Sequence, residues 1–98
     1  MNTRFDYSVE PPKYVWLNGA LVSWQEATIP VAAMGASGSL AVFEGIKAYW
    51  NAEQENLFVF RLEDHMRRLY ESMKIVRMTP AVPQSSMENG AIELLKAN

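Results

Sequence analysis

The sequence predicts an α+β domain in which an antiparallel sheet of hairpins is packed by two helices. Three observations support this fold class. Asn18 and Gly19 separate two segments rich in aromatic and β-branched residues, and two more short apolar segments follow between residues 42 and 60. From residue 62 onwards, apolar residues recur at helical spacing. Hairpins followed by helices are typical of α+β domains rather than of alternating parallel folds.

The composition limits the classes of function. Of the 98 residues, 49% are hydrophobic and 20% are charged, which is typical of a globular domain. The net charge of −2 creates no global positive field, so we expect neither nucleic acid nor a membrane as a partner. Cysteine is absent and His65 is the only histidine, which argues against disulfides and against a metal site. The first twelve residues lack the apolar core of a secretion signal, so we expect a cytoplasmic protein.

Residues 1–12 are predicted to form an N-terminal arm that ends at two prolines, and residues 13–98 to form the domain itself. The first hairpin is expected at 14–17 and 20–24. The Asn-Gly pair between these segments tolerates the positive φ angles of a two-residue hairpin turn.

The middle of the chain gives weaker signals. Residues 29–31 are expected to be extended because proline disfavours helix at the residue before it. The small residues of 34–39 are compatible with a loop or with one short helical turn. A second hairpin is predicted from 42–50 and 57–60, with a polar connector at 51–56.

Two helices complete the prediction. The first spans 62–77, with acidic residues in its first turn and basic residues in its last. Its apolar stripe consists of Leu62, Met66, Leu69, Met73 and Val76. Two prolines, at 80 and 83, separate it from a final helix. We predict that this helix begins near Ser85 or Ser86, because Ser85 and Glu88 have the spacing of a capping box.

The helix at 62–77 also carries the most informative polar residues. His65 and Arg68 lie on the same flank beside the apolar stripe, three residues apart, so both side chains can reach one site. The planar fork of an arginine suits a phosphate. The alternative is a surface ion pair between Asp64 and Arg68, with Arg67 pairing with a neighbouring glutamate and His65 serving as a partly buried structural residue.

Glu44 and Gly45 interrupt an otherwise apolar segment. A glycine in such a place marks either a bend at the edge of a sheet or the wall of a ligand pocket. The chain has four lysines, at 13, 47, 74 and 96. None has sequence neighbours that mark it as a reactive amine.

Three segments in order resemble one family. The first covers 14–27 and includes the Asn-Gly hairpin. The second, at 42–49, resembles the family pattern F-E-G-I-R-x-Y, and the third, at 60–69, contains H-x-x-R-L. Over residues 14–97, the chain resembles the N-terminal small domain of branched-chain amino acid aminotransferases, which are pyridoxal-phosphate enzymes of fold type IV.

This resemblance implies a set of functional residues. Arg68 would hold the phosphate of pyridoxal 5'-phosphate, and Phe43 and Gly45 would line the substrate pocket. Lys47 stands on the substrate side, where the family usually has arginine. The complete enzymes of the family move an amino group from a branched-chain amino acid to 2-oxoglutarate, as in branched-chain amino acid biosynthesis, and work as dimers. A homo-oligomer is therefore expected.

The resemblance also marks what this sequence lacks. In the family, the lysine that carries the cofactor lies in a C-terminal domain, and no lysine here matches it. We therefore expect the isolated chain to be catalytically incompetent. Residues 37–39, Ser-Gly-Ser, replace the H-Y-G of the branched-chain enzymes. The alternatives are a relative of D-amino acid aminotransferase or aminodeoxychorismate lyase, or a noncatalytic interaction domain.

Overall fold

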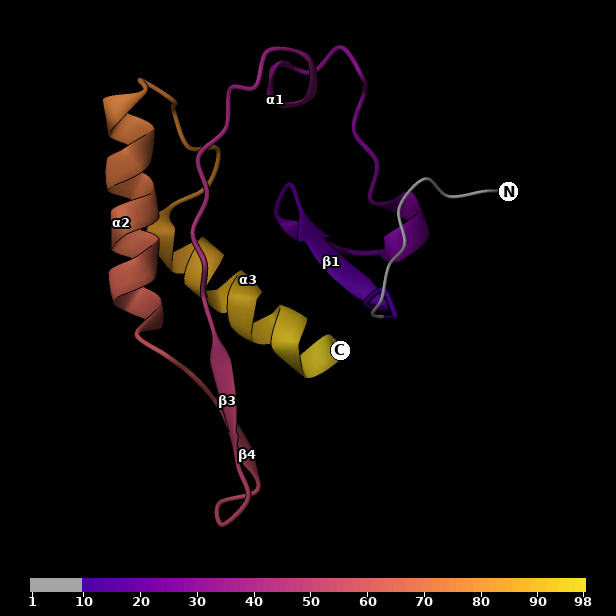
Figure 1. The fold of residues 1–98 in the computed structure, drawn as a ribbon, viewed down its shortest axis with the longest axis vertical. Helices are drawn as coiled ribbons and strands as arrows, with labels where there is room; N and C mark the ends of the chain where they lie inside the picture. Colours follow the sequence, from indigo (N-terminus) through magenta and orange to yellow (C-terminus); the bar gives the residue numbers. More distant parts are fainter. Residues whose placement is uncertain (1–9) are drawn as a thin grey trace.

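The computed structural model describes residues 10–98 and confirms the α+β fold class (Figure 1). Most of the predicted arm at 1–12 therefore lies outside the described residues. Two antiparallel hairpins form two separate two-stranded sheets, the first from β1 (Tyr14–Leu17) and β2 (Ala20–Ser23), the second from β3 (Ala48–Asn51) and β4 (Asn56–Val59). The helices are α1 (Met34–Ser37), α2 (Leu62–Ile75) and α3 (Gln84–Ala97), with a short 3-10 helix at Trp24–Glu26.

The first hairpin turns where the sequence predicts. Asn18 and Gly19 have φ angles of 53° and 89°, so both occupy the left-handed region that a tight hairpin turn requires. Val15 pairs with Val22 across the ladder. Trp24, predicted to end the second strand, instead begins the 3-10 helix, where the Glu26 carboxylate accepts hydrogen bonds from the backbone N–H and hydroxyl of Ser23.

Helix α2 begins after Arg61, which adopts a left-handed conformation with φ of 49°, and ends at Ile75, two residues before the predicted end. The predicted capping box of α3 is wrong. Its N-cap is Pro83, which makes no side-chain cap, and the helix begins at Gln84 rather than at Ser85 or Ser86. The fixed φ of Pro83, here −70°, already orients the chain for the first turn.

Helix α3 lies against the first hairpin (Figure 1). Gly90 of α3 is buried against the Trp16 ring, and a Cβ at position 90 would lie 2.5 Å from Cε2 of that ring. The Asn98 side chain exchanges two hydrogen bonds of 3.1 Å with the backbone N–H and carbonyl of Tyr14. Helix α3 is thus attached to β1 both along its length and at its C-terminal end.

Helix α2 packs against α3 and contributes the buried apolar residues of the core, Met66 and Leu69. The remainder of its predicted stripe is only partly covered, and Val76 is exposed. The Tyr70 hydroxyl donates a hydrogen bond to the carbonyl of Val82, which ties α2 to the connector before α3.

The second hairpin projects away from the rest of the molecule (Figure 1). Its first strand is shorter than predicted, because β3 begins at Ala48 rather than at Val42. Its second strand has the predicted length but lies one residue earlier, at Asn56–Val59. Tyr49 pairs with Phe58 and Trp50 with Leu57, and all four side chains are exposed. Within residues 10–98, no helix combines the length and hydrophobicity needed to span a membrane.

Candidate functional site

The N-terminal half of α2 borders a cavity of about 330 Å³. Six of the seven residues that line this cavity have ionisable side chains, because one face of the N-terminal part of α2 borders the cavity. The lining residues are Phe60, Arg61, Asp64, His65, Arg67, Arg68 and Glu71. This cavity contains both residues that the sequence singled out on the helix, His65 and Arg68.

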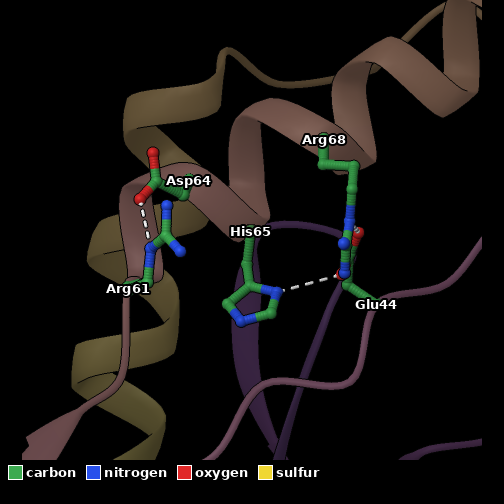
Figure 2. A network of polar contacts seen from close by, with 5 residues as sticks. All are labelled: Glu44, Arg61, Asp64, His65 and Arg68. Atoms are coloured by element: carbon green, nitrogen blue, oxygen red, sulfur yellow. Dashed lines mark hydrogen bonds and ion pairs between the residues drawn. The ribbon is translucent and has the colours of Figure 1, made fainter.

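A carboxylate from outside the helix joins these two residues (Figure 2). Glu44 accepts two hydrogen bonds from Arg68, one from Nε to Oε1 and one of 2.6 Å from Nη2 to Oε2. Its Oε2 also lies 3.0 Å from Nδ1 of His65. The Glu44 side chain is only 6% exposed, whereas that of His65 is 19% exposed and that of Arg68 is 66% exposed. The carboxylate is therefore enclosed and the arginine remains open to solvent.

These contacts favour the ionised form of Glu44 and the protonated form of Arg68. The hydrogen bonds from Arg68, and then the one with His65, lower the pKa of Glu44 from 4.5 to about 2. The same pairing raises the pKa of Arg68. Since an ionised carboxylate can only accept hydrogen bonds, the Nδ1 of His65 carries the proton that lies between them. Glu44 is thus a fixed anion at neutral pH, held by two side chains from one helix face.

The predicted ion pair between Asp64 and Arg68 is wrong. Asp64 instead pairs with Arg61 at 2.8 Å and with Arg67 at 2.6 Å. Arg67 therefore pairs with Asp64 rather than with either glutamate at 63 or 71. Arg61 first, and then Arg67, lowers the pKa of the Asp64 carboxyl. Arg61, which precedes the helix in a left-handed conformation, pairs with Asp64, and Arg68 pairs with Glu44.

The three remaining predicted residues lie on one side of the chain. In residues 41–48, which we call the extended run, exposed and less exposed residues alternate without interruption. This period of two places Phe43, Gly45 and Lys47 on the outer side and Glu44 on the inner side. Phe43 is 88% exposed, and open space surrounds the position of a Cβ at Gly45.

The structure thus brings together some of the predicted site residues and leaves others apart. Arg68 lines the cavity and contacts the residue between Phe43 and Gly45. Phe43, Gly45 and Lys47 are absent from the cavity lining, and none of the four lysines borders it. Among the described residues, no cluster of three or more side chains suited to a metal ion occurs.

The arrangement can bind an anion. An arginine has five N–H donors, and Glu44 occupies two of them. Three donors of Arg68, including both on Nη1, remain for a ligand. A phosphate fits this guanidinium because it accepts parallel hydrogen bonds from one edge of the fork.

Sequence reasoning missed the role of Glu44. Val42, Glu44 and Ile46 mark one face of an extended segment, and a carboxylate between two apolar residues on that face requires a cationic or hydrogen-bonding partner. That signal was present in the sequence, but it did not identify the partner on α2.

Comparisons with known proteins agree with the fold and with the sequence motifs. No protein-family model matches the chain. Over 85 residues it is 31% identical to a branched-chain-amino-acid aminotransferase of Escherichia coli strain K12, covering 87% of this chain and 27% of that protein.

Two solved structures show the same similarity. The branched-chain aminotransferase of the archaeon Thermoproteus uzoniensis, crystallised with norvaline, superposes with a TM-score of 0.82 and 41% identity, over 90% of this chain and 29% of that one. The branched-chain amino acid aminotransferase of Thermobaculum terrenum, in its PLP form, gives a TM-score of 0.79 and 40% identity, over 88% and 28%. This chain therefore spans little more than a quarter of the length of these relatives.

Proposed function

We propose, because this chain has the sequence and the fold of a segment of the branched-chain aminotransferases, that it supplies part of the active site of such an enzyme. In the complete enzyme, an amino group moves from a branched-chain amino acid to 2-oxoglutarate, as in branched-chain amino acid biosynthesis. The cofactor is pyridoxal 5'-phosphate, which supplies an electron sink for this chemistry when bound. The single observation that carries this function is the cavity beside Arg68, whose free donors fit a phosphate.

Arg68 is the proposed phosphate ligand. Its guanidinium is open to solvent on the side away from Glu44, and it lines a cavity with room for a ligand headgroup. Arg61 and Arg67 border the same cavity, but each is already paired with Asp64. Arg68 is distinguished by its partner and not by its number of free donors: Arg61 and Arg67 each give one N–H to Asp64, whereas Arg68 gives two to Glu44, which lies on the segment that carries Phe43 and Gly45.

Phe43, Gly45 and Lys47 are the proposed substrate-side residues. They share the outer side of the extended run, where Phe43 offers an apolar surface and Gly45 leaves space beside it. Lys47 adds a positive charge in the same row. A branched aliphatic side chain matches an apolar wall of this kind.

The remaining parts of the proposal concern the protein as a whole. We assign residues 13–98 to the small domain, and place the cofactor-bearing lysine in the part of such an enzyme that lies outside the segment matched here. A homo-oligomer, a dimer by family, is supported by the exposed aromatic residues of the second hairpin. A cytoplasmic location is consistent with the absence of cysteine.

The phosphate role can be tested with 4-deoxypyridoxine 5'-phosphate, a cofactor analogue without the aldehyde, and with its unphosphorylated form. NMR titration of the 98-residue chain should show that the phosphorylated analogue binds about tenfold more tightly. Arg68→Lys keeps the charge but loses the planar fork, so it should remove most of this preference. Arg67→Lys is the matched control, because Arg67 lines the same cavity but pairs with Asp64.

Two results would contradict this function. One is equal affinity of the unaltered chain for both analogues. The other is an unchanged preference in Arg68→Lys together with a lost preference in Arg67→Lys, which would assign the phosphate to the other arginine.

A second experiment asks whether any lysine of this chain forms a Schiff base with the cofactor. Pyridoxal phosphate added to the chain and then reduced with borohydride should give only scattered, substoichiometric labelling, because no lysine borders the cavity. Peptide mapping identifies the labelled positions. A stoichiometric adduct at one lysine would show that this chain carries its own reactive amine.

A further inference from the structure

Glu44 is the most enclosed charged side chain of the site, and no role follows for it from the phosphate and substrate residues. It lies on the inner side of the extended run, between two residues of the proposed substrate side. Its three hydrogen bonds all go to α2 (Figure 2). It therefore connects the run that carries Phe43 and Gly45 to the helix that carries Arg68.

The edge of the Arg68 guanidinium that Glu44 occupies determines which N–H donors remain for a ligand. Its two oxygens take Nε and Nη2, which form the side edge of the fork. The end edge, formed by Nη1 and the second N–H of Nη2, stays free and points away from the carboxylate. A bidentate pair of this kind fixes the plane of the guanidinium as well as its position.

We propose that Glu44 is a positioning residue. By binding the side edge of the Arg68 guanidinium, it presents the end edge to a phosphate. It also holds the extended run against α2. This inference rests on the proposed phosphate role of Arg68. Without Glu44, the arginine side chain, which is largely exposed, samples many rotamers and loses part of its affinity as conformational entropy on binding.

Glu44 also carries a negative charge, which opposes the binding of an anion nearby. Removing it therefore has two opposite effects on phosphate affinity: a Coulomb gain and a positioning loss. Salt separates them, because the repulsion between Glu44 and a phosphate on the solvent-exposed edge of Arg68 weakens with ionic strength, though less than for two exposed charges, whereas the loss of side-chain order does not change. If positioning dominates, the loss of affinity on removing Glu44 grows as salt is added.

The experiment compares Glu44→Gln with Asp64→Asn in the 98-residue chain. Each substitution removes one negative charge from the surroundings of the cavity, but Asp64 contacts Arg61 and Arg67 rather than Arg68. The first measurement is the exchange rate of the Arg68 Nε–H, whose NMR signal is assigned by its loss in Arg68→Lys. The second is the affinity for 4-deoxypyridoxine 5'-phosphate at 0.15 and about 0.5 M salt.

The expected result separates the two variants. Glu44→Gln should accelerate exchange of the Arg68 Nε–H and weaken phosphate binding about tenfold, more at the higher salt. Asp64→Asn should leave exchange at Arg68 unchanged and binding equal or tighter. Glu44→Asp, which keeps the carboxylate on a shorter stem, should recover part of the affinity, and it replaces Glu44→Gln if that variant does not fold.

Other results would overturn the positioning role. If Glu44→Gln binds the phosphorylated analogue as well as the unaltered chain does, or more tightly, Glu44 acts as a structural or opposing charge only. Failure of the proposed function looks different, because the unaltered chain would then bind both analogues equally. The exchange rate of Arg68 in Glu44→Gln would still decide whether Glu44 holds the guanidinium.

Discussion

The two hairpins have strands of the same length and the same antiparallel pairing, yet within residues 10–98 one packs against a helix and the other does not. The first hairpin lies against α3, with Trp16 packed on Gly90 and Asn98 bound to Tyr14. The second hairpin has no comparable packing among the described residues, and Trp50 is 64% exposed. The same residue type, tryptophan in a four-residue strand, thus serves packing in one place and remains open to solvent in the other.

The difference supports the proposal that the second hairpin is covered by a further part of the enzyme or by a second copy of the chain. A domain gains little by exposing four large apolar side chains on one hairpin, since each would be more stable if buried. The extended run leads directly into this hairpin and carries Phe43 on its outer side. Both features place uncovered apolar groups next to the proposed substrate side, as expected for a segment of a larger or oligomeric enzyme.

Replacing the two tryptophans tests this contrast most strongly. Trp16→Ala should lower the free energy of unfolding by about 2–3 kcal/mol, because it removes a partly covered ring from the contact with α3. Trp50→Ala should change it by less than about 0.5 kcal/mol, as for other exposed positions. Urea denaturation followed by circular dichroism measures both. Equal losses would mean that the second hairpin is as well packed as the first.

Adding a methyl group at Gly90 tests how tightly α3 packs against the first hairpin. Gly90→Ala should destabilise the chain by a net ~1 kcal/mol, because overpacking against the Trp16 ring exceeds the gain in helix propensity. Gly45→Ala is the matched control, since nothing lies within 4 Å of its Cβ position.

A double variant isolates the contact itself. Combining Gly90→Ala with Trp16→Ala should cost less than the sum of the two single changes, because the ring that opposes the new methyl group is gone. Strict additivity in urea denaturation would place the effect of Gly90 elsewhere.

Acid should loosen the attachment of the extended run, with the smallest effect of the series. The pKa of Glu44 is lowered to about 2 in the folded chain, so its contribution to stability is present above its ordinary value of 4.5 and is lost as the pH falls towards 2. Urea midpoints measured between pH 7 and about pH 2.5 should fall less steeply for Glu44→Gln than for the unaltered chain. Parallel curves for the two proteins would contradict this role of Glu44.

The local elements were predictable wherever a short segment determines its own conformation. The Asn-Gly turn is one example, because both residues tolerate positive φ without help from the rest of the chain. Helix α2 is another, since its apolar spacing and the charges at its ends agree. The start of α3 at Gln84 was not predictable in this way, because the Ser-x-x-Glu spacing occurs twice in the sequence. Ser23 and Glu26 use it, whereas Ser85 and Glu88 do not.

The polar partners of the site depend on contacts that sequence spacing cannot reveal. Spacing favoured Asp64 for Arg68, since the two lie four residues apart on one helix. In the structure, Asp64 instead pairs with Arg61, and a carboxylate 24 residues away pairs with Arg68. The flank of α2 was therefore predictable, but the identity of its partner was not.

The central claim is that Arg68, held by Glu44, is the arginine that receives a phosphate. The most direct measurement is the NMR spectrum of the arginine side chains during titration with 4-deoxypyridoxine 5'-phosphate. Our account predicts that the Arg68 guanidinium signals shift with saturation while those of Arg61 and Arg67, bound to Asp64, stay in place. Shifts confined to Arg61 and Arg67, with Arg68 unchanged, would contradict it.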